Sequence, residues 1–280
     1  MYTENRPLRD RIREKGVLVA AHRGTRGGNV IQNTCLACRN ALLHGADVVE
    51  MDAAMTRDGV FYAFHDGEEP LVCGVSENIR TMSAAQADAL TVFNSLGLPV
   101  RQKLERLEQV FDALRGTCLI NVDRAWFYWP EIIGRIHDCG MERQVILKSP
   151  PEPAYLRQLE QTGEGIMYMP ILKSVKEWER VREFDVNVAA AELIFADLES
   201  PLVSEAFLGE LRREGIAPWV NAITLDDDTV LSGGLDDNRA IGEGFEAAWG
   251  ELVRMGFEMI QTDWPALLRG YLDGGRCSRS

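Results

Sequence analysis

The chain has 280 residues and a formal net charge of −13 at pH 7, with 46% hydrophobic and 26% charged residues. This balance is that of a soluble globular protein with one large domain or two ordinary ones, and its acidity argues against nucleic acid as a partner. No apolar run reaches the roughly 20 residues that span a bilayer, and the polar amino-terminal stretch is unlike a secretory signal, so we expect a cytoplasmic protein without stable membrane insertion.

The first expected strand is the apolar run 17–21, which has the pattern of a strand buried on both faces. It follows a short charged helix over 9–15 and is followed directly by His22 and Arg23. A glycine-rich loop comes next, and a helix then begins at Asn33-Thr34 and ends near residue 44.

The next strand begins at residue 48 and carries Glu50 and Asp52 in an otherwise apolar run. Because strand side chains alternate between faces, both carboxylates point the same way. Burying two carboxylates together is costly, and a hard divalent cation would remove that cost. A turn over 57–59 and a second short strand then lead to His65. The alternative is an amphipathic hairpin with its acids facing water.

Residues 66 to about 104 contain turn residues and one short capped helix, which predicts a small insertion after the second strand. Strands and helices alternate beyond it. The expected helices cover 105–114, 130–139, 153–162, 174–181, 202–214, 243–255 and 265–271, and the expected strands cover 118–122, 144–147, 166–169, 186–191, 216–220 and 258–261.

This alternation predicts an α/β fold with a parallel sheet, and eight such strands fit a closed (β/α)₈ TIM barrel in a single domain over 1–280. An open doubly wound sheet is the alternative, but the chain lacks a GxGxxG after its first strand. In such barrels the active site lies at the carboxyl ends of the strands. The residues expected there are His22, Arg23, Glu50, Asp52, His65, Asp66, Asp123, Lys148, Glu192, Trp219, Asn221, Asp263 and Trp264.

Two histidines, several acids and two cations at one face suit metal-assisted attack on an anionic ester. Several motifs occur in order, namely His22-Arg23-Gly24, Asn33-Thr34, Gly45-Ala46-Asp47, Glu50-x-Asp52, Asp58-Gly59, His65-Asp66 and Thr262-Asp263-x-Pro265. Their order and spacing resemble those of the glycerophosphodiester phosphodiesterase family. The resemblance implies a TIM barrel, one divalent metal (Mg²⁺ or Ca²⁺, with Mn²⁺ as a further option) and hydrolysis of a small anionic phosphodiester to a phosphomonoester and an alcohol.

The same resemblance assigns roles to the central residues. Glu50 and Asp52 match the family's metal ligands, and Asp123 stands where many members have a glutamate ligand. His22 and His65 match the two histidines that act as acid and base, a pairing that suits proton transfer near neutral pH.

Other residues are expected to contact the substrate. Arg23 and Lys148 would hold the phosphate. Glu192 is expected either to contact a substrate hydroxyl or to pair with Lys148. Trp219 and Trp264 are expected either to form a wall for a sugar or glycerol group or to be ordinary packing residues.

Some features leave alternatives open. Gln32 stands where the family usually has a glutamate, which leaves metal affinity and substrate choice open. A sugar phosphodiester of the opine type (agrocinopine-like) and a non-catalytic ligand-binding barrel are the alternative functions. We interpret Asp236 and Asp237 as solvated loop acids, and His44 and His137 as surface or capping residues. The scattered cysteines are expected to be reduced and structural, and the sequence leaves the oligomeric state open.

Overall fold

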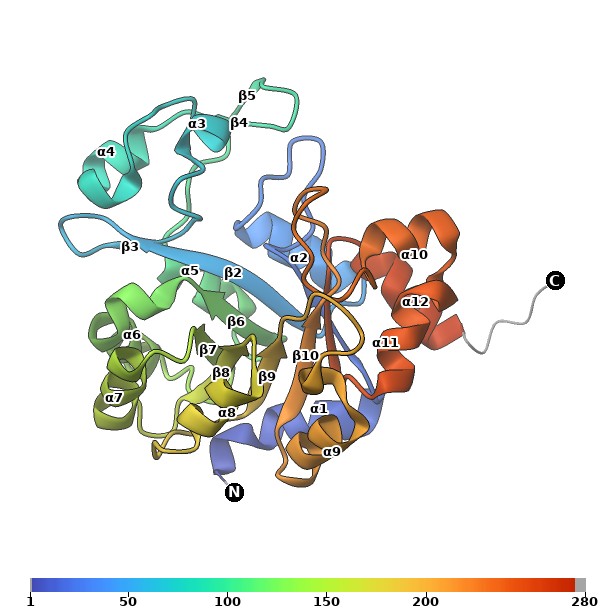
Figure 1. Cartoon of the computed structure of the whole chain (residues 1–280). Helices are drawn as coiled ribbons and strands as arrows, with labels where there is room; N and C mark the ends of the chain where they lie inside the picture. Colours follow the sequence, from blue (N-terminus) through green and yellow to red (C-terminus); the bar gives the residue numbers. More distant parts are fainter. Residues whose placement is uncertain (1, 275–280) are drawn as a thin grey trace.

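Eight parallel strands close into a barrel in the computed structural model, which describes residues 2–274 (Figure 1). Around the barrel the order is β1, β2, β6, β7, β8, β9, β10 and β11, and β11 pairs back to β1. The strands are β1 Leu18–Ala21, β2 Val48–Met55, β6 Leu119–Asp123, β7 Val145–Ser149, β8 Met167–Leu172, β9 Ala190–Leu193, β10 Ala217–Asn221 and β11 Met259–Thr262. The predicted (β/α)₈ TIM barrel is confirmed.

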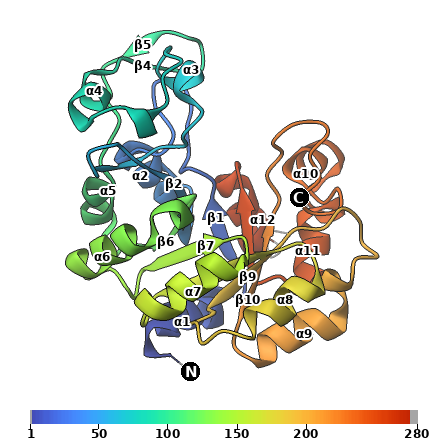
Figure 2. The same ribbon diagram turned by 60° about the vertical axis from the view of Figure 1, so that its left-hand side comes forward.

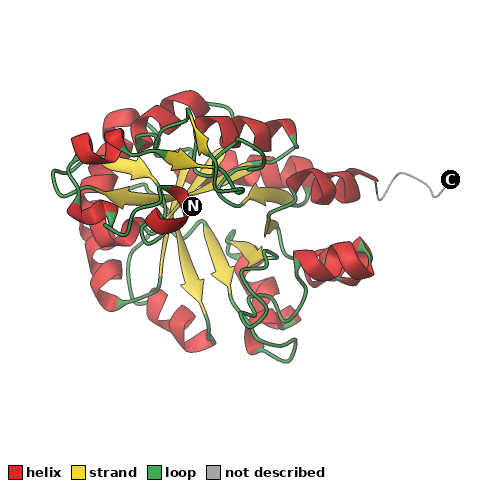
Figure 3. Ribbon diagram, turned by 90° about the horizontal axis from the view of Figure 1, so that it is seen from above, coloured by secondary structure: helices red, strands yellow, loops and turns green. Residues whose placement is uncertain are grey.

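Helices surround this ring of strands when it is seen from above (Figure 3). The apolar faces of most of them pack on the outside of the barrel, which explains their amphipathic sequences. They are α1 Arg6–Lys15, α2 Cys35–Leu43, α5 Leu107–Leu114, α6 Trp129–Cys139, α7 Pro153–Thr162, α8 Val175–Val181, α9 Glu205–Arg213, α10 Asp237–Glu243, α11 Trp249–Met255 and α12 Pro265–Gly274. Short 3₁₀ turns are η1 Thr3–Asn5, η3 Ala125–Tyr128, η4 Pro201–Val203 and η5 Phe245–Ala247.

The barrel interior is filled by side chains in layers, because alternate residues of each strand point inward. The lower layers are apolar, and Leu8 and Ile12 of α1 belong to the same cluster as the inward side chains of the strands. The next inward positions toward the carboxyl ends carry buried polar side chains, namely Glu50, Asn121, Lys148, Glu192, Asn221 and Gln261. The barrel therefore has an apolar plug and a polar layer just beneath its mouth.

The segment between β3 (Phe61–Ala63) and α5 stands out from the barrel (Figure 2). It holds α3 Glu69–Val72, η2 Ile79–Thr81, α4 Ala84–Ala89 and the antiparallel pair β4 Val92–Phe93 and β5 Pro99–Val100. Its buried apolar side chains form a third cluster together with Ile31, Ala54 and Tyr62, separate from the two barrel clusters. This segment lies in the stretch where the sequence predicts an insertion.

Strand β9 begins at Ala190, so the strand predicted over 186–191 is displaced toward the carboxyl terminus. The cause is Asn187, which is buried and exchanges side-chain hydrogen bonds of 2.8 and 2.9 Å with Asn5. This pair holds residues 184–189 in irregular backbone that the apolar pattern did not reveal. Glu192 consequently lies within the strand and not beyond its end.

The helix predicted over 243–255 is confirmed only in its second part, as α11, because η5 and non-helical residues occupy the first part and the separate helix α10 precedes it. Gly244 has φ of +112°, which ends α10, and Ala248 leaves the helical region before α11 begins. The helix predicted over 202–214 begins later, at Glu205, because the Ser204 side chain accepts a hydrogen bond from the Phe207 N–H and caps it there.

The cysteines at 35, 38, 73, 118 and 139 are free thiols, as predicted, and Cys277 lies outside the described residues. Over residues 2–274, no helix combines the length and the hydropathy that a membrane crossing requires.

Candidate active site

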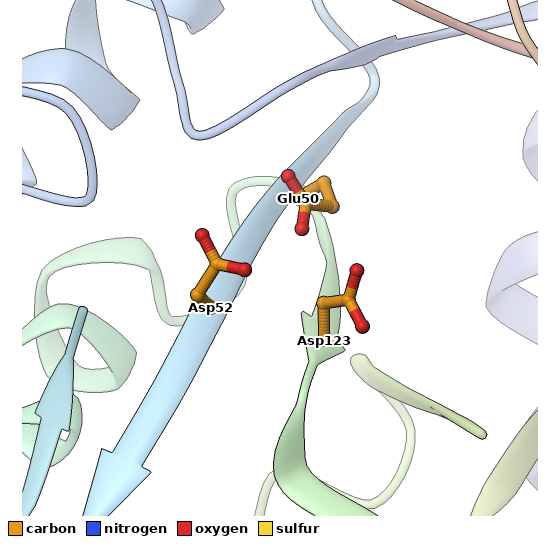
Figure 4. Close-up of side chains that lie close together, drawn as sticks. All are labelled: Glu50, Asp52 and Asp123. Carbon is orange, nitrogen blue, oxygen red and sulfur yellow. The ribbon is translucent and has the colours of Figure 1, made fainter. Parts of the chain in front are cut away.

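Three carboxylates meet at the mouth of the barrel (Figure 4). Glu50 and Asp52 project from β2 and Asp123 ends β6, and each offers an oxygen within 4.8 Å of the others. The parallel register of the two strands places Asp52 directly beside Asp123, which is why residues far apart in the sequence converge. The structure thus brings together the three residues predicted as metal ligands.

The electrostatics of this cluster favour a bound cation. Burial, followed by the charge of Asp52, raises the pKa of Glu50 to about 7. Glu50 and Asp52 are buried, so their negative charges repel each other with little screening by water. Three close carboxylates with oxygen donors are the ligand set that hard divalent cations prefer. The residues present therefore fit such a metal.

Lys148 lies among the acids of the polar layer. Its Nζ is 2.8 Å from Asp123 Oδ2 and 3.0 Å from Glu192 Oε2. Burial by itself lowers the pKa of Lys148, but the charges of Asp123, Glu192 and Glu50 outweigh it and raise that pKa overall. Lys148 is therefore a fixed positive charge. Two roles were predicted for Glu192, a contact with a substrate hydroxyl or an ion pair with Lys148, and the structure shows the ion pair.

Arg23 wraps around the carboxylates with both its backbone and its side chain. Its backbone N–H donates to Glu50 Oε2 at 3.0 Å, and its Nε lies 3.0 Å from Asp52 Oδ2. A second guanidinium nitrogen donates to Glu68, whose other oxygen accepts from the Gln32 side chain. Arg23 therefore already has two acidic partners where the sequence suggested a free phosphate contact.

The two histidines each use Nδ1 for a contact within the protein. His22 Nδ1 lies 2.9 Å from Asp263 Oδ1, and His65 Nδ1 lies 3.0 Å from the carbonyl oxygen of Asp66. A carboxylate and a carbonyl can only accept, so Nδ1 carries the proton in both rings and Nε2 is the nitrogen offered to a substrate. Burial lowers the pKa of His22, but the hydrogen bond with Asp263 and the charge of Glu50 raise it overall.

Asn33 and Glu68 contribute to the site although the sequence pattern assigned them no such role. Asn33 exchanges two hydrogen bonds with Asp52, donating from Nδ2 to Oδ2 at 3.0 Å and accepting from the Asp52 N–H at 3.1 Å. The sequence showed Asn33 only as a helix start, yet Thr34 caps that helix. Glu68 reaches Arg23 through tertiary contact alone, so no local pattern could have found it.

The interpretation of Asp237 as a solvated loop acid is wrong. It is buried and accepts hydrogen bonds from the Asp263 N–H (2.9 Å), Thr262 Oγ1 (2.8 Å) and Trp249 Nε1 (3.0 Å). Burial raises its pKa to about 7. Asp237 therefore holds the backbone turn from which Asp263 reaches His22. The neighbouring Asp236 caps the amino terminus of α10, and its position before the helix led to the interpretation of both acids as loop residues.

A cavity of about 230 Å³ opens above the polar layer. Of the predicted site residues, His22, Arg23, Asp52, His65, Asp123, Lys148 and Glu192 line it. Asn221 and Gln261 from the polar layer line it too, as does Trp126, which the aromatic run after the third barrel strand supplies.

Neither predicted tryptophan lies on the wall of this cavity. Trp219 is fully buried in the apolar plug, and its Nε1 donates to Asn221 Oδ1 at 2.8 Å, so it supports a lining residue from below. Trp264 is half exposed and borders a separate hollow together with residues 24–27 and His44. Trp219 faces the plug because it lies two residues before Asn221 on the same side of β10.

Two family models match parts of the chain. Residues 22–126 match the glycerophosphoryl diester phosphodiesterase family, and residues 168–272 match a family described as a domain of unknown function. Lysophospholipase D GDPD3 of Mus musculus is 35% identical over 66 residues. That match covers 24% of this chain and 20% of the mouse protein, so it spans about a fifth of the length of that relative.

Solved structures share the barrel over nearly the whole chain. A glycerophosphoryl diester phosphodiesterase from Parabacteroides distasonis has a TM-score of 0.75 and 17% identity over 94% of this chain and 88% of its own. An Oleispira antarctica phosphodiesterase in complex with the product sn-glycerol-3-phosphate has a TM-score of 0.66 and 15% identity over 91% of this chain and 96% of its own. At these identities the likeness shows the fold.

Proposed function

Because residues 22–126 match the glycerophosphoryl diester phosphodiesterase family, we propose that the chain is a metal-dependent phosphodiesterase of that family. Its substrate would be a small glycerophosphodiester-like anion, which it cleaves to a phosphomonoester and an alcohol. We propose the cytoplasm as the location of the protein. The observation that carries the proposal is the meeting of three carboxylates and two oriented histidines at one barrel mouth. The family match over 22–126 contains all five of these residues.

The proposed metal ligands are Glu50, Asp52 and Asp123. Mg²⁺ and Ca²⁺ are the first candidates and Mn²⁺ the third, because all three accept carboxylate and water oxygens. When bound, the cation would supply Lewis-acid stabilisation of the negative charge on the phosphate oxygens. Asn33 supports this arrangement, since its amide fixes the orientation of the Asp52 carboxylate.

The two histidines are proposed to move the protons. His65 presents an unprotonated Nε2 when neutral, so it suits the role of base toward the attacking oxygen. His22 is paired with a carboxylate that favours the imidazolium, so it suits the role of acid that protonates the departing alcohol oxygen. The attacking oxygen would be water or a substrate hydroxyl next to the phosphate. In the second case water opens the cyclic phosphate while the histidines exchange roles.

The cations would place the phosphate. Arg23 lines the cavity and has five donors, of which Asp52 and Glu68 engage only some, so it can still bind a phosphate oxygen. Lys148 is proposed to act mainly through Asp123, by holding that carboxylate and balancing its charge.

The function is tested by measuring phosphomonoester release from a panel of diesters, with EDTA and with added Mg²⁺, Ca²⁺ or Mn²⁺. The panel contains glycerophosphocholine, glycerophosphoethanolamine, a sugar–phosphate–sugar diester and bis(p-nitrophenyl) phosphate. We expect cleavage of at least one natural diester that EDTA abolishes and a metal restores. Protection against unfolding by a diester without its cleavage would identify a binding barrel.

A further inference from the structure

The cavity at the barrel mouth has two unlike halves. The half built by β1, β2, β6 and β7 carries the charged residues described above. On the other side Glu192, Asn221 and Gln261 form a polar floor, and the remaining lining side chains are apolar, namely Trp126, Ile171, Ile194, Ile223, Leu225 and Leu231. The proposed chemistry uses only the charged half, so the second half needs a separate explanation.

Three isoleucines of this wall come from adjacent strands. Ile171 lies on β8, Ile194 follows β9 and Ile223 follows β10, and each stands two residues beyond an inward residue of its own strand. With the alternation of strand side chains they occupy the top inward position of the barrel. His22, Asp52 and Asp123 line the same cavity and belong to its charged half.

The loop between β10 and α10 completes the wall and is held in place by backbone pairing. The Phe195 N–H donates to the Leu231 carbonyl at 3.1 Å, and the Gly233 N–H donates to the Phe195 carbonyl at 2.9 Å. Gly233 has φ of +60°, which suits the glycine that makes this turn. Leu225 on the same loop is 53% exposed although it lines the cavity. The loop thus presents apolar surface to whatever enters.

We propose that this wall is the seat of a hydrocarbon chain, so that one of the two ester groups of the substrate is an alkyl group and not a polyol or a sugar. This inference rests on the proposed function, because the charged half must hold the phosphate. A hydroxylated or charged group against the six side chains would lose water without gaining hydrogen bonds. A methylene chain gains by leaving water at the same place.

The test compares glycerophosphate esters of methanol, propanol and hexanol as substrates, with Mg²⁺ present. We expect kcat/KM to rise about tenfold or more from the methyl to the hexyl ester, since each fully buried methylene contributes up to about fourfold. Ile171→Thr and Ile194→Thr keep the branched shape and should lower the hexyl-to-methyl ratio of kcat/KM. Val230→Thr is the matched control, because Val230 is half exposed on the loop between β10 and α10 and does not line the cavity.

A readout without turnover separates this inference from the proposed function. The melting temperature is measured with the methyl and hexyl esters of methylphosphonic acid, and the hexyl ester should stabilise more. Cleavage of the diesters with a flat or falling dependence on chain length overturns the hydrocarbon seat and leaves the function standing. No cleavage of any diester overturns the function, and equal stabilisation by the two phosphonates then overturns the seat as well.

Discussion

Backbone strain concentrates around the three carboxylates. Over residues 2–274 the non-glycine residues with positive φ are Arg23, Asn33 and Arg124, with φ of +55°, +57° and +57°. Arg23 and Asn33 hydrogen-bond Glu50 and Asp52, and the Arg124 N–H donates to Asp123 at 2.6 Å. Each such residue costs about 1–3 kcal/mol. The site is therefore held in place at the expense of local stability.

Substitutions of Asn33 distinguish the cost of its backbone conformation from its role in orienting the Asp52 carboxylate. Asn33→Ala removes the hydrogen bonds to Asp52 and keeps the strain, so we expect about 10–100-fold lower kcat/KM and about 1 kcal/mol lower stability in urea unfolding. Asn33→Gly relieves the strain but lacks the same amide. Activity of the glycine variant near that of the parent would show that Asn33 serves the backbone and not Asp52.

His22 and His65 should be individually indispensable for turnover. His22→Ala and His65→Ala are each expected to lower kcat by about 10²–10⁴-fold, the usual contribution of a positioned acid or base. Initial rates on the best diester measure this loss, and His137→Ala, on the exposed face of α6, is the control. Near-parental turnover of the His22 variant on every cleaved diester would contradict the proposed chemistry.

The partner of His22 should set the alkaline limb of the pH profile. The pKa of His22 is raised, so the ring stays protonated to a higher pH than a free histidine and can serve as an acid there. Asp263→Asn removes the charge that favours the imidazolium, so the alkaline limb of kcat should move to lower pH. The measurement is kcat between pH 5 and 9 in both proteins. If the alkaline limb of the kcat profile does not move, a group other than His22 sets that limb.

At the scale of elements, the turn from β11 to α12 depends on α10. Asp237 at the start of α10 accepts three hydrogen bonds from Thr262, Asp263 and Trp249. Asp237→Ala leaves three buried donors without a partner, at about 1–3 kcal/mol each. We expect it to lower the free energy of unfolding by several kcal/mol and to slow catalysis through His22, whereas the less drastic Asp237→Asn should retain the fold.

The Asp237→Asn variant also tests the ionisation of this carboxyl group. The folded pKa of Asp237 is raised to about 7, so the folded state holds the proton more tightly than the unfolded state and the parent loses stability as pH rises through that value. The amide of the variant does not ionise over this range. Urea unfolding at pH 5.5 and pH 8 should therefore show the variant gaining stability relative to the parent at the higher pH. An equal difference at both values would contradict a raised pKa.

The elements that the sequence revealed are those with strong local patterns. Apolar runs such as 17–21 and the run that begins at residue 48 predicted buried strands, and the polar residues on and after them predicted the site. The boundaries that failed were set by tertiary contacts, as for β9, where Asn187 pairs with Asn5. Asn33, Glu68 and Asp237 were missed for the same reason, since their partners come from other elements and leave no periodic trace.

For the whole molecule, metal binding should be visible as stability. The three carboxylates come from two strands of one closed barrel, so a cation that they hold binds the folded chain only. At a hundredfold excess over Kd this adds about 2.7 kcal/mol, which raises the melting temperature by several degrees in a chain of this size. Differential scanning calorimetry with EDTA and with Mg²⁺ measures the shift. Glu50→Gln should abolish it, and a shift that survives would place the cation elsewhere.

The closure of the barrel by β11 and β1 has a consequence for how the protein is made. Of the eight barrel strands, β1 leaves the ribosome first and its partner β11 leaves it last. Until then the ring is open. Non-local pairings of this kind slow folding and expose strand edges to other chains. The nascent barrel therefore remains an open sheet with exposed strand edges until β11 has been synthesised.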